Sequence, residues 1–424
     1  ASSYAFFARA NSAVGAGSLK HADASTTIET AASTPSTART IGRDIDLDDS
    51  APGARAPCYG GRMTQKSYDV LVDKVREASL VQSIAGLLGW DQETMMPADG
   101  AEHRSKQMAL LAGLFHERIT SKDVASLLGD VEASSWLAGA PAAAQANVRE
   151  IRRVHDRATK VPRALVEEIA KTVPVSQHAW AKARKASSFS EFRPHLEKMV
   201  KLKREEARAL SHGAAGGDVY DALLDENEPG MKTAELEPLF DALQKGIVPL
   251  VAAIKAKGNA KLPWEGRTFP AERQRVLCAT VPPALGLQPT SSRLDVSAHP
   301  FSQRIGRGDV RITTRFDEHD LGGAYFGVLH ETGHALYEQG LDPKHDGEPA
   351  GEARSLGVHE SQSRFWENLV GRSRAYWTGA YPFVRALFHE ALGDVDVDAF
   401  HRAINRVEPS FIRVEADEVT YNLH

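Results

Sequence analysis

Two histidines and a glutamate form the sequence His-Glu-x-x-His at residues 330–334, a spacing that could hold a metal ion. Residues four apart lie on one face of an α-helix, so His330 and His334 can bind one cation together. Glu331 lies roughly 100° round the helix from His330, which suits a general base acting on metal-bound water better than a ligand. The flanking residues are mostly apolar, so this helix should be buried. The alternative is a pair of core histidines hydrogen-bonded to the backbone.

A hydrolytic zinc site needs a third protein ligand and an open position for water. The helix that carries the histidines should end at Gly340, and a loop containing Pro and Gly should follow over residues 341–351. A second helix is predicted from Ser355, and Glu360 within it is the candidate third ligand. The argument for Glu360 is the buried face expected from its helix: Leu356, His359, Phe365, Trp366 and Leu369. Glu360 could instead be a solvated acid, and His359 either supports a ligand or, as we favour, is an ordinary core histidine.

The elements that must position these groups are mostly helical. Apolar residues recur at spacings of three and four from Thr64 onward, the pattern of amphipathic helices. Breaks are expected at several prolines, including Pro174 and the pair Pro282-Pro283. Residues 309–316 alternate between β-branched and polar side chains and follow two glycines, so they should form a strand of a small hairpin or sheet.

Composition excludes several classes of protein. The chain has 424 residues and a formal charge of -5, which argues against a nucleic-acid-binding surface. No run of eighteen apolar residues occurs, so no membrane-spanning helix is expected. The cysteines, Cys58 and Cys278, are too few for a disulfide scaffold, and a reducing, cytoplasmic location is expected.

Two regions are predicted along the chain. Residues 1–62 are rich in Ala, Ser, Thr, Gly and Arg and cannot bury enough apolar surface to offset their ordering entropy. We expect a disordered extension there, either an organelle-targeting segment or an ill-defined gene start. Residues 63–424 should form the helical domain that holds the site.

Several motifs in this domain resemble those of the carboxypeptidase Taq family of metallocarboxypeptidases. Besides His-Glu-x-x-His, the sequence contains His-Pro-Phe at 299–301, Asp-x-Arg-x-Thr at 309–313 and His-Glu-Ser-Gln at 359–362. It also contains Ile-Arg-x-x-Ala-Asp at 412–417 and Leu-Gly-Trp-Asp-Gln-Glu-Thr at 88–94. The resemblance runs from about Thr64 to His424.

The resemblance implies a zinc exopeptidase that removes single C-terminal residues with broad specificity. It implies a mainly α, two-lobed helical fold with a deep groove and a small β hairpin or sheet beside the zinc helix, as in angiotensin-converting-enzyme-like and neurolysin-like peptidases. It also implies a homodimer with peptide substrates, neither nucleic acid nor a membrane as partner, and a site in which Co²⁺ or another divalent metal can replace Zn²⁺. The third zinc ligand of the family corresponds to Glu360 here.

Two further roles need residues: a hydrogen-bond donor to the oxyanion and a partner for the substrate carboxylate. The oxyanion of the reaction requires hydrogen-bond donors, for which Tyr421 is the first candidate and His299 the second. A substrate carboxylate suits an arginine, whose planar guanidinium pairs two oxygens at once. Arg413 lies in the motif that the family associates with this role, and Arg311 is the alternative.

One departure from the family pattern bears on activity. The family carries a further Gly-x-x-Gln-Asp-x-His-Trp motif, and the sequence ends before it. We therefore expect a domain shortened at its C-terminus, without some of the helices that close the groove. Two alternatives to a carboxypeptidase stay open: an inactive fragment or peptide-binding relative, and a zinc endopeptidase or dipeptidase with the same ligands.

Overall fold

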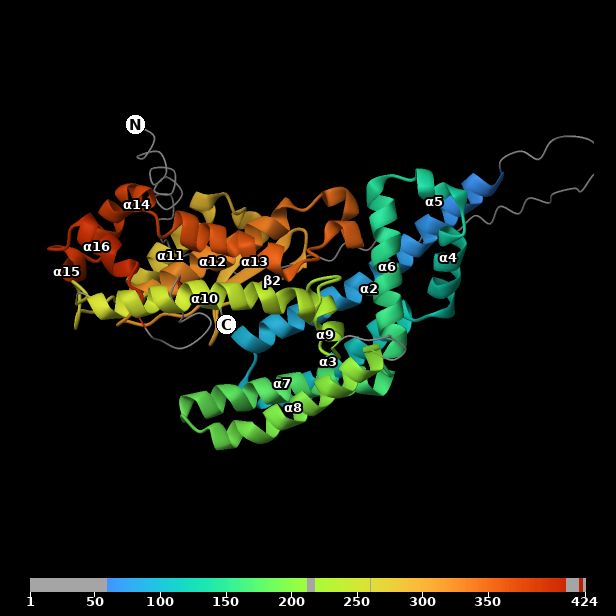
Figure 1. Cartoon of the computed structure of the whole chain (residues 1–424), viewed down its shortest axis with the longest axis horizontal. Helices are drawn as coiled ribbons and strands as arrows, with labels where there is room; N and C mark the ends of the chain where they lie inside the picture. Colours follow the sequence, from blue (N-terminus) through green and yellow to red (C-terminus); the bar gives the residue numbers. More distant parts are fainter. Residues whose placement is uncertain (1–58, 212–217, 260, 409–418, 422–424) are drawn as a thin grey trace, which may run out of the picture.

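The computed structural model describes residues 59–211, 218–259, 261–408 and 419–421 (Figure 1). The predicted extension over residues 1–62 lies outside these ranges, apart from residues 59–62, which belong to the first helix. Within the described ranges, no helix combines the length and hydropathy that crossing a bilayer requires.

The N-terminal half is a set of helices around one apolar core. Leu71, Leu128 and Ile151 lie at its centre and are almost completely buried. Helices α7 and α8 pack against each other as a hairpin that projects to one side (Figure 1). The elements are α2 (Tyr59–Thr94), the 3₁₀ turn η1 (Ala98–Gly100), α3 (Ala101–Ile119), α4 (Lys122–Glu132), α5 (Ser135–Gly139), α6 (Ala142–Lys160), α7 (Arg163–Lys185) and α8 (Phe189–Ser211).

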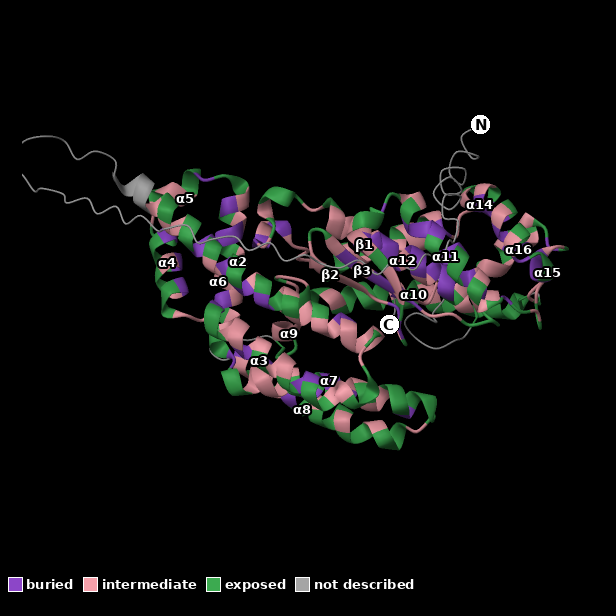
Figure 2. Ribbon diagram, turned by 180° about the vertical axis from the view of Figure 1, so that it is seen from behind, coloured by how far each residue is buried: buried purple, intermediate pink, exposed green. Residues whose placement is uncertain are grey.

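The C-terminal half has a second core, built around one central helix. Tyr325 and Leu329 of that helix, α12, pack with Trp377 of a later helix and with Phe388, which lies between two later helices. Figure 2 shows buried residues concentrated on α11 and α12. The helices are α9 (Asp221–Asn227), α10 (Thr233–Lys257), α11 (Ala271–Leu285), α12 (Leu321–Gly340), α13 (Leu356–Arg364), α14 (Arg374–Leu387), α15 (His389–Leu392) and α16 (Val397–Ile404).

A three-stranded sheet lies beside α12. Its strands are β1 (Ser292–Val296), β2 (Ser302–Gly306) and β3 (Asp309–Thr314), in the order β1-β3-β2, with β1 parallel and β2 antiparallel to β3. Val310 and Ile312 of β3 are buried and pack in one cluster with Ala335 of α12. The alternation in residues 309–316 therefore predicts the strand correctly, and its buried side chains pack towards the helix that carries the histidines.

Two of the expected helix breaks are wrong. Helix α7 runs through Pro174, which is buried, and α11 runs through Pro282 and Pro283 to Leu285. A proline inside a helix removes one backbone hydrogen bond and costs about 3 kcal/mol. In α7 this cost is offset by packing against α3 and α8. In α11 the prolines stand in the last turn, where their carbonyls accept hydrogen bonds from Leu287 and Gly286.

Candidate metal centre

Helix α12 fixes the two histidines on one face. It begins after Asp320, whose side chain accepts a hydrogen bond from the Gly322 backbone N–H and so caps the first turn. It ends at Gly340 as predicted. The imidazole rings of His330 and His334 have their centroids 4.9 Å apart, and both side chains are only slightly exposed. One helical turn therefore presents two nitrogen donors to the same point.

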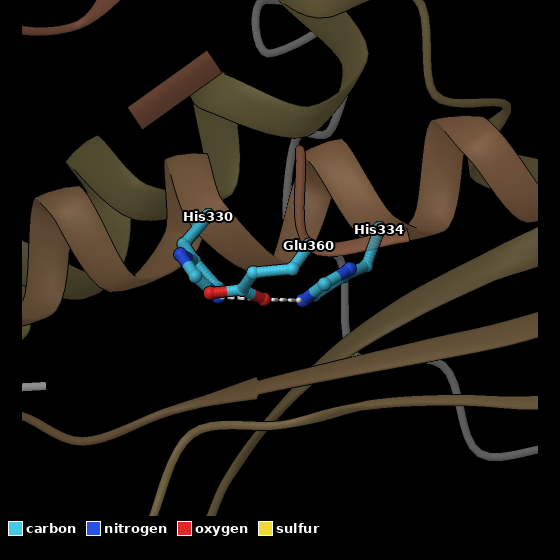
Figure 3. A group of neighbouring side chains, drawn as sticks. All are labelled: His330, His334 and Glu360. Atoms are coloured by element: carbon cyan, nitrogen blue, oxygen red, sulfur yellow. Dashed lines mark ion pairs between the residues drawn. The ribbon is translucent and has the colours of Figure 1, made fainter. Parts of the chain in front are cut away.

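Glu360 of α13 completes a group of three possible ligands (Figure 3). Its Oε2 atom lies 3.2 Å from Nε2 of His334 and 3.6 Å from Nε2 of His330. One donor atom from each residue lies within 4.8 Å of the other two. The structure thus brings together the three residues that the sequence analysis selects as ligands.

A glycine allows α12 and α13 to approach so closely. A Cβ atom at Gly333 would lie 2.6 Å from the Gln362 carbonyl oxygen and 2.6 Å from the Ser363 Cα atom. Ser363 in turn donates a hydrogen bond to the Glu360 carboxylate, at 3.1 Å. Backbone contact at Gly333 therefore sets the distance between the helix of the histidines and the helix of the carboxylate.

The argument from a buried apolar face of α13 is wrong. Leu356 is 57% exposed and Leu369 is 71% exposed, and Phe365 is also exposed. Glu360 reaches the histidines because of the helix approach at Gly333. His359 is not an isolated core histidine: it stacks on the His334 ring with 4.4 Å between centroids and contacts Glu338 at 2.9 Å.

The connection between α12 and α13 is anchored to the N-terminal core. It contains two short 3₁₀ turns, Pro343–His345 and Pro349–Gly351. The amide of Asn147 from α6, which is fully buried, donates to Glu348 at 2.7 Å and to Tyr68 at 2.9 Å, and accepts from the Ala350 N–H at 2.7 Å. Arg76 of α2 also pairs with Glu348, at 2.6 Å. Side chains from α2 and α6 thus hold the segment that precedes Glu360.

The charges of the site are strongly coupled. Burial alone would lower the pKa of His330, but hydrogen bonds with Glu360 and Glu367 raise it to about 10. Burial acts to raise the pKa of Glu360, and the two histidines hold it well below its usual range. Burial lowers the pKa of His334. Glu360 is therefore ionised and available as a ligand.

Glu331 lies in a different environment from Glu360. Its side chain is buried, and burial raises its pKa to about 7. A carboxyl group with a pKa near neutrality can both accept and return a proton. This property matches the general base that its position beside His330 suggests.

The three residues fit a divalent cation. Two imidazoles and one carboxylate are the donor set of many hydrolytic zinc sites. The buried Nδ1 atom of His334 has no hydrogen-bond partner among the described residues, whereas Nε2 of both rings points to the shared carboxylate oxygen. This arrangement leaves the Nε2 atoms and the Glu360 carboxylate to serve as ligands.

Glu367 is a further residue of the site that the sequence motifs do not predict. Its Oε2 atom lies 2.8 Å from Nδ1 of His330. It stands seven residues after Glu360, two helical turns along the same face, and this spacing could have suggested it. The π-helical turn η5 (Phe365–Val370), in which Glu367 stands, gives no comparable signal in the sequence.

The other candidate residues, Tyr421, His299 and Arg413, do not all lie at the ligand group. The Tyr421 hydroxyl donates a hydrogen bond to Oε1 of Glu360, so this side chain lies beside the ligand group. His299 precedes Pro300, which lies beside Gly327, one turn before His330. Arg413 lies outside the described residues.

Arg311 lies on β3, where its guanidinium already has partners. Two of its nitrogens contact the Asp309 carboxylate, at 2.6 and 2.8 Å. The same group stacks over the Trp90 ring of α2, 4.3 Å from the centroid. Thr313, in the same motif, hydrogen-bonds the Phe301 N–H at 3.0 Å. The Asp-x-Arg-x-Thr motif thus connects the sheet to α2 and to the His-Pro-Phe segment.

Comparisons with known proteins identify the family of this chain. The carboxypeptidase Taq (M32) metallopeptidase family model matches residues 70–424. Thermostable carboxypeptidase 1 of Thermus thermophilus is 45% identical over 369 residues, covering 85% of this chain and 72% of the relative. Carboxypeptidase 1 of Bacillus subtilis is 36% identical over 353 residues, covering 83% and 70%. The crystal structure of the M32 carboxypeptidase of Deinococcus radiodurans matches with a TM-score of 0.75 and 40% identity, covering 85% of this chain and 71% of that one. This chain therefore belongs to the carboxypeptidase Taq family of metallopeptidases.

Proposed function

We propose that this protein is a zinc-dependent carboxypeptidase that removes residues from the C-termini of peptides with broad specificity. The observation that carries the proposal is the convergence of His330, His334 and Glu360, with the buried Glu331 beside them, in a member of this family. The family resemblance also supports a homodimer, and the low cysteine content supports a cytoplasmic location.

His330, His334 and Glu360 would hold the metal. When bound, a divalent cation supplies Lewis acidity towards a carbonyl and lowers the pKa of water. Glu331 takes a proton from the attacking water and returns it to the leaving amine. Its burial keeps bulk water from competing for that proton, and its pKa of about 7 suits both transfers at neutral pH.

Substrate recognition is assigned to the remaining candidates. Tyr421, whose hydroxyl is at the Glu360 carboxylate, is the proposed donor to the oxyanion, with His299 as the second candidate. Arg413 is the proposed partner of the substrate carboxylate. Arg311 is the weaker candidate because Asp309 and Trp90 already occupy its guanidinium.

The test compares two substrates and one variant. An N-blocked dipeptide with a free carboxylate should be cleaved after zinc is supplied, and the same dipeptide with a C-terminal amide should not. Glu331→Gln should bind zinc with unchanged stoichiometry and lose roughly 10²- to 10⁴-fold in kcat, the usual contribution of a general base.

Each outcome has a definite meaning. Turnover retained in Glu331→Gln would overturn the general-base assignment. Equal cleavage of the amidated dipeptide would favour the endopeptidase alternative. A pure protein that takes up no zinc would overturn the proposed function as a whole.

A further inference from the structure

We propose that Glu367 is a positioning residue that fixes the orientation and tautomer of His330 as a metal ligand. This inference rests on the metal centre of the proposed function. It adds a residue outside the three ligands and the proposed base, one that acts on the metal only through His330.

The contact between the two side chains carries the argument. Oε2 of Glu367 lies 2.8 Å from Nδ1 of His330, while Nε2 of the same ring points to Glu360. An ionised carboxylate can only accept a hydrogen bond, so the proton of the ring is held on Nδ1. A cation that binds this ring must then displace the proton from Nε2 rather than from Nδ1, and the ring cannot turn without losing its contact with Glu367.

Two arginines hold Glu367 in place. Arg364 lies 3.6 Å from its Oε2 atom and Arg372 lies 3.5 Å from its Oε1 atom, while the Glu367 side chain is only 14% exposed. Arg372 is itself fixed by stacking over the Phe326 ring, 4.1 Å from the centroid. The carboxylate is thus charged, enclosed and held on both oxygens, which is what an orienting group requires.

The backbone brings Glu367 against α12. The π-helical turn η5 interrupts the regular helix after Arg364, and such turns often occur at functional sites. Gly371 follows directly, and a Cβ atom there would lie 2.6 Å from the Leu329 side chain. The end of the π-helical turn therefore packs closely against Leu329, the residue before His330.

The two histidines differ in how they are oriented. His330 has a carboxylate on its second ring nitrogen. The second nitrogen of His334, Nδ1, has no partner within the described part of the chain, and its ring is held by stacking on His359. Loss of Glu367 should therefore weaken one ligand selectively.

A metal-affinity experiment tests the inference. The full chain is stripped of metal, and its Kd for zinc is measured by competition with a chromophoric chelator for the wild type, Glu367→Gln, Glu367→Asp and Glu206→Gln. Glu367→Gln should weaken zinc binding by roughly 10- to 100-fold. Glu367→Asp retains the charge and should recover part of the loss.

Glu206→Gln is the matched control. Glu206 of α8 is about as enclosed as Glu367, with a side chain 17% exposed, and pairs with Lys203, but it lies outside the ligand group. Removing this charge should change the zinc Kd by less than about threefold. An equal loss in Glu206→Gln and Glu367→Gln would show a general charge effect and overturn the specific role of Glu367.

The remaining outcomes separate this inference from the proposed function. A wild-type protein that binds no zinc would remove the metal centre and both proposals with it. Tight binding by the wild type and equally tight binding by Glu367→Gln would overturn the role of Glu367 and leave the metal centre intact. Should Glu367→Gln fail to fold, an unchanged Kd in Glu367→Asp overturns the role, and a weakening of about tenfold supports it.

Discussion

The close approach of α12 and α13 at Gly333 can be tested by adding one methyl group. In Gly333→Ala the new Cβ atom would meet two backbone atoms of α13 at 2.6 Å, against an ordinary contact distance of at least 3.4 Å. Backbone cannot rotate away as a side chain can, so α13 must move by roughly 0.8 Å. Glu360 moves with it, away from His330 and His334.

The expected loss of zinc affinity follows from how little metal–ligand distances can vary. Metal–ligand distances vary by only about 0.2 Å in well-formed sites, so a shift of this size should weaken zinc binding at least about tenfold. Overpacking should also lower the free energy of unfolding by about 1–3 kcal/mol. The higher helix propensity of alanine returns at most about 1 kcal/mol of this loss.

Chelator competition and urea denaturation measure the two effects. Gly340→Ala is the control, because it lies at the end of the same helix and a Cβ atom there would contact nothing within 4 Å. It should bind zinc as the wild type does. Wild-type zinc affinity and stability in Gly333→Ala would refute the idea that contact at this glycine sets the ligand geometry.

Two further predictions concern the scaffold. Asn147→Leu removes three hydrogen bonds of a fully buried amide, so the free energy of unfolding in urea should fall by roughly 2–4 kcal/mol, and a loss below about 0.5 kcal/mol would contradict the importance of this network. Glu390 of α15 pairs with Arg273 of α11, at 3.0 Å between Oε1 and Nη2, and the hydrogen bonding from Arg273 lowers the pKa of Glu390 from 4.5 to about 2. A lowered carboxyl pKa stabilises the fold above the unfolded pKa, and this stabilisation is lost as pH falls through the folded value. The Tm difference between wild type and Glu390→Gln should therefore be present at pH 7 and shrink below about pH 4.5, whereas a difference independent of pH would argue against the ion pair.

Local patterns predicted the central helix well. The spacing of His330 and His334, the flanking apolar residues and Gly340 are all read within one helix, and the structure shows a buried helix that ends at Gly340. The strand predicted over residues 309–316 is present as β3, Asp309–Thr314, because alternation is also a local property.

Relations between elements were harder to predict. Glu360 was selected with the help of apolar neighbours that prove to be exposed, and the structure brings it to the histidines through backbone contact at Gly333. The seven-residue spacing from Glu360 is a local hint at Glu367, but its contact with His330 depends on a π-helical turn that the sequence does not signal. The passage of α7 through Pro174 depends on packing against α3 and α8. Such features depend on residues distant in sequence, and periodicity within one segment does not contain them.

Through the hydrogen bonds of Asn147, the geometry of the metal centre depends on the N-terminal helices. The two histidines stand on a helix embedded in the C-terminal core, whereas the third ligand follows a connection fastened to α6 and α2. The coordination group is therefore assembled from parts supported by different cores. Substitutions some two hundred positions before Glu360 can therefore displace its carboxylate from the two histidines, although the substituted residues contact neither metal nor substrate.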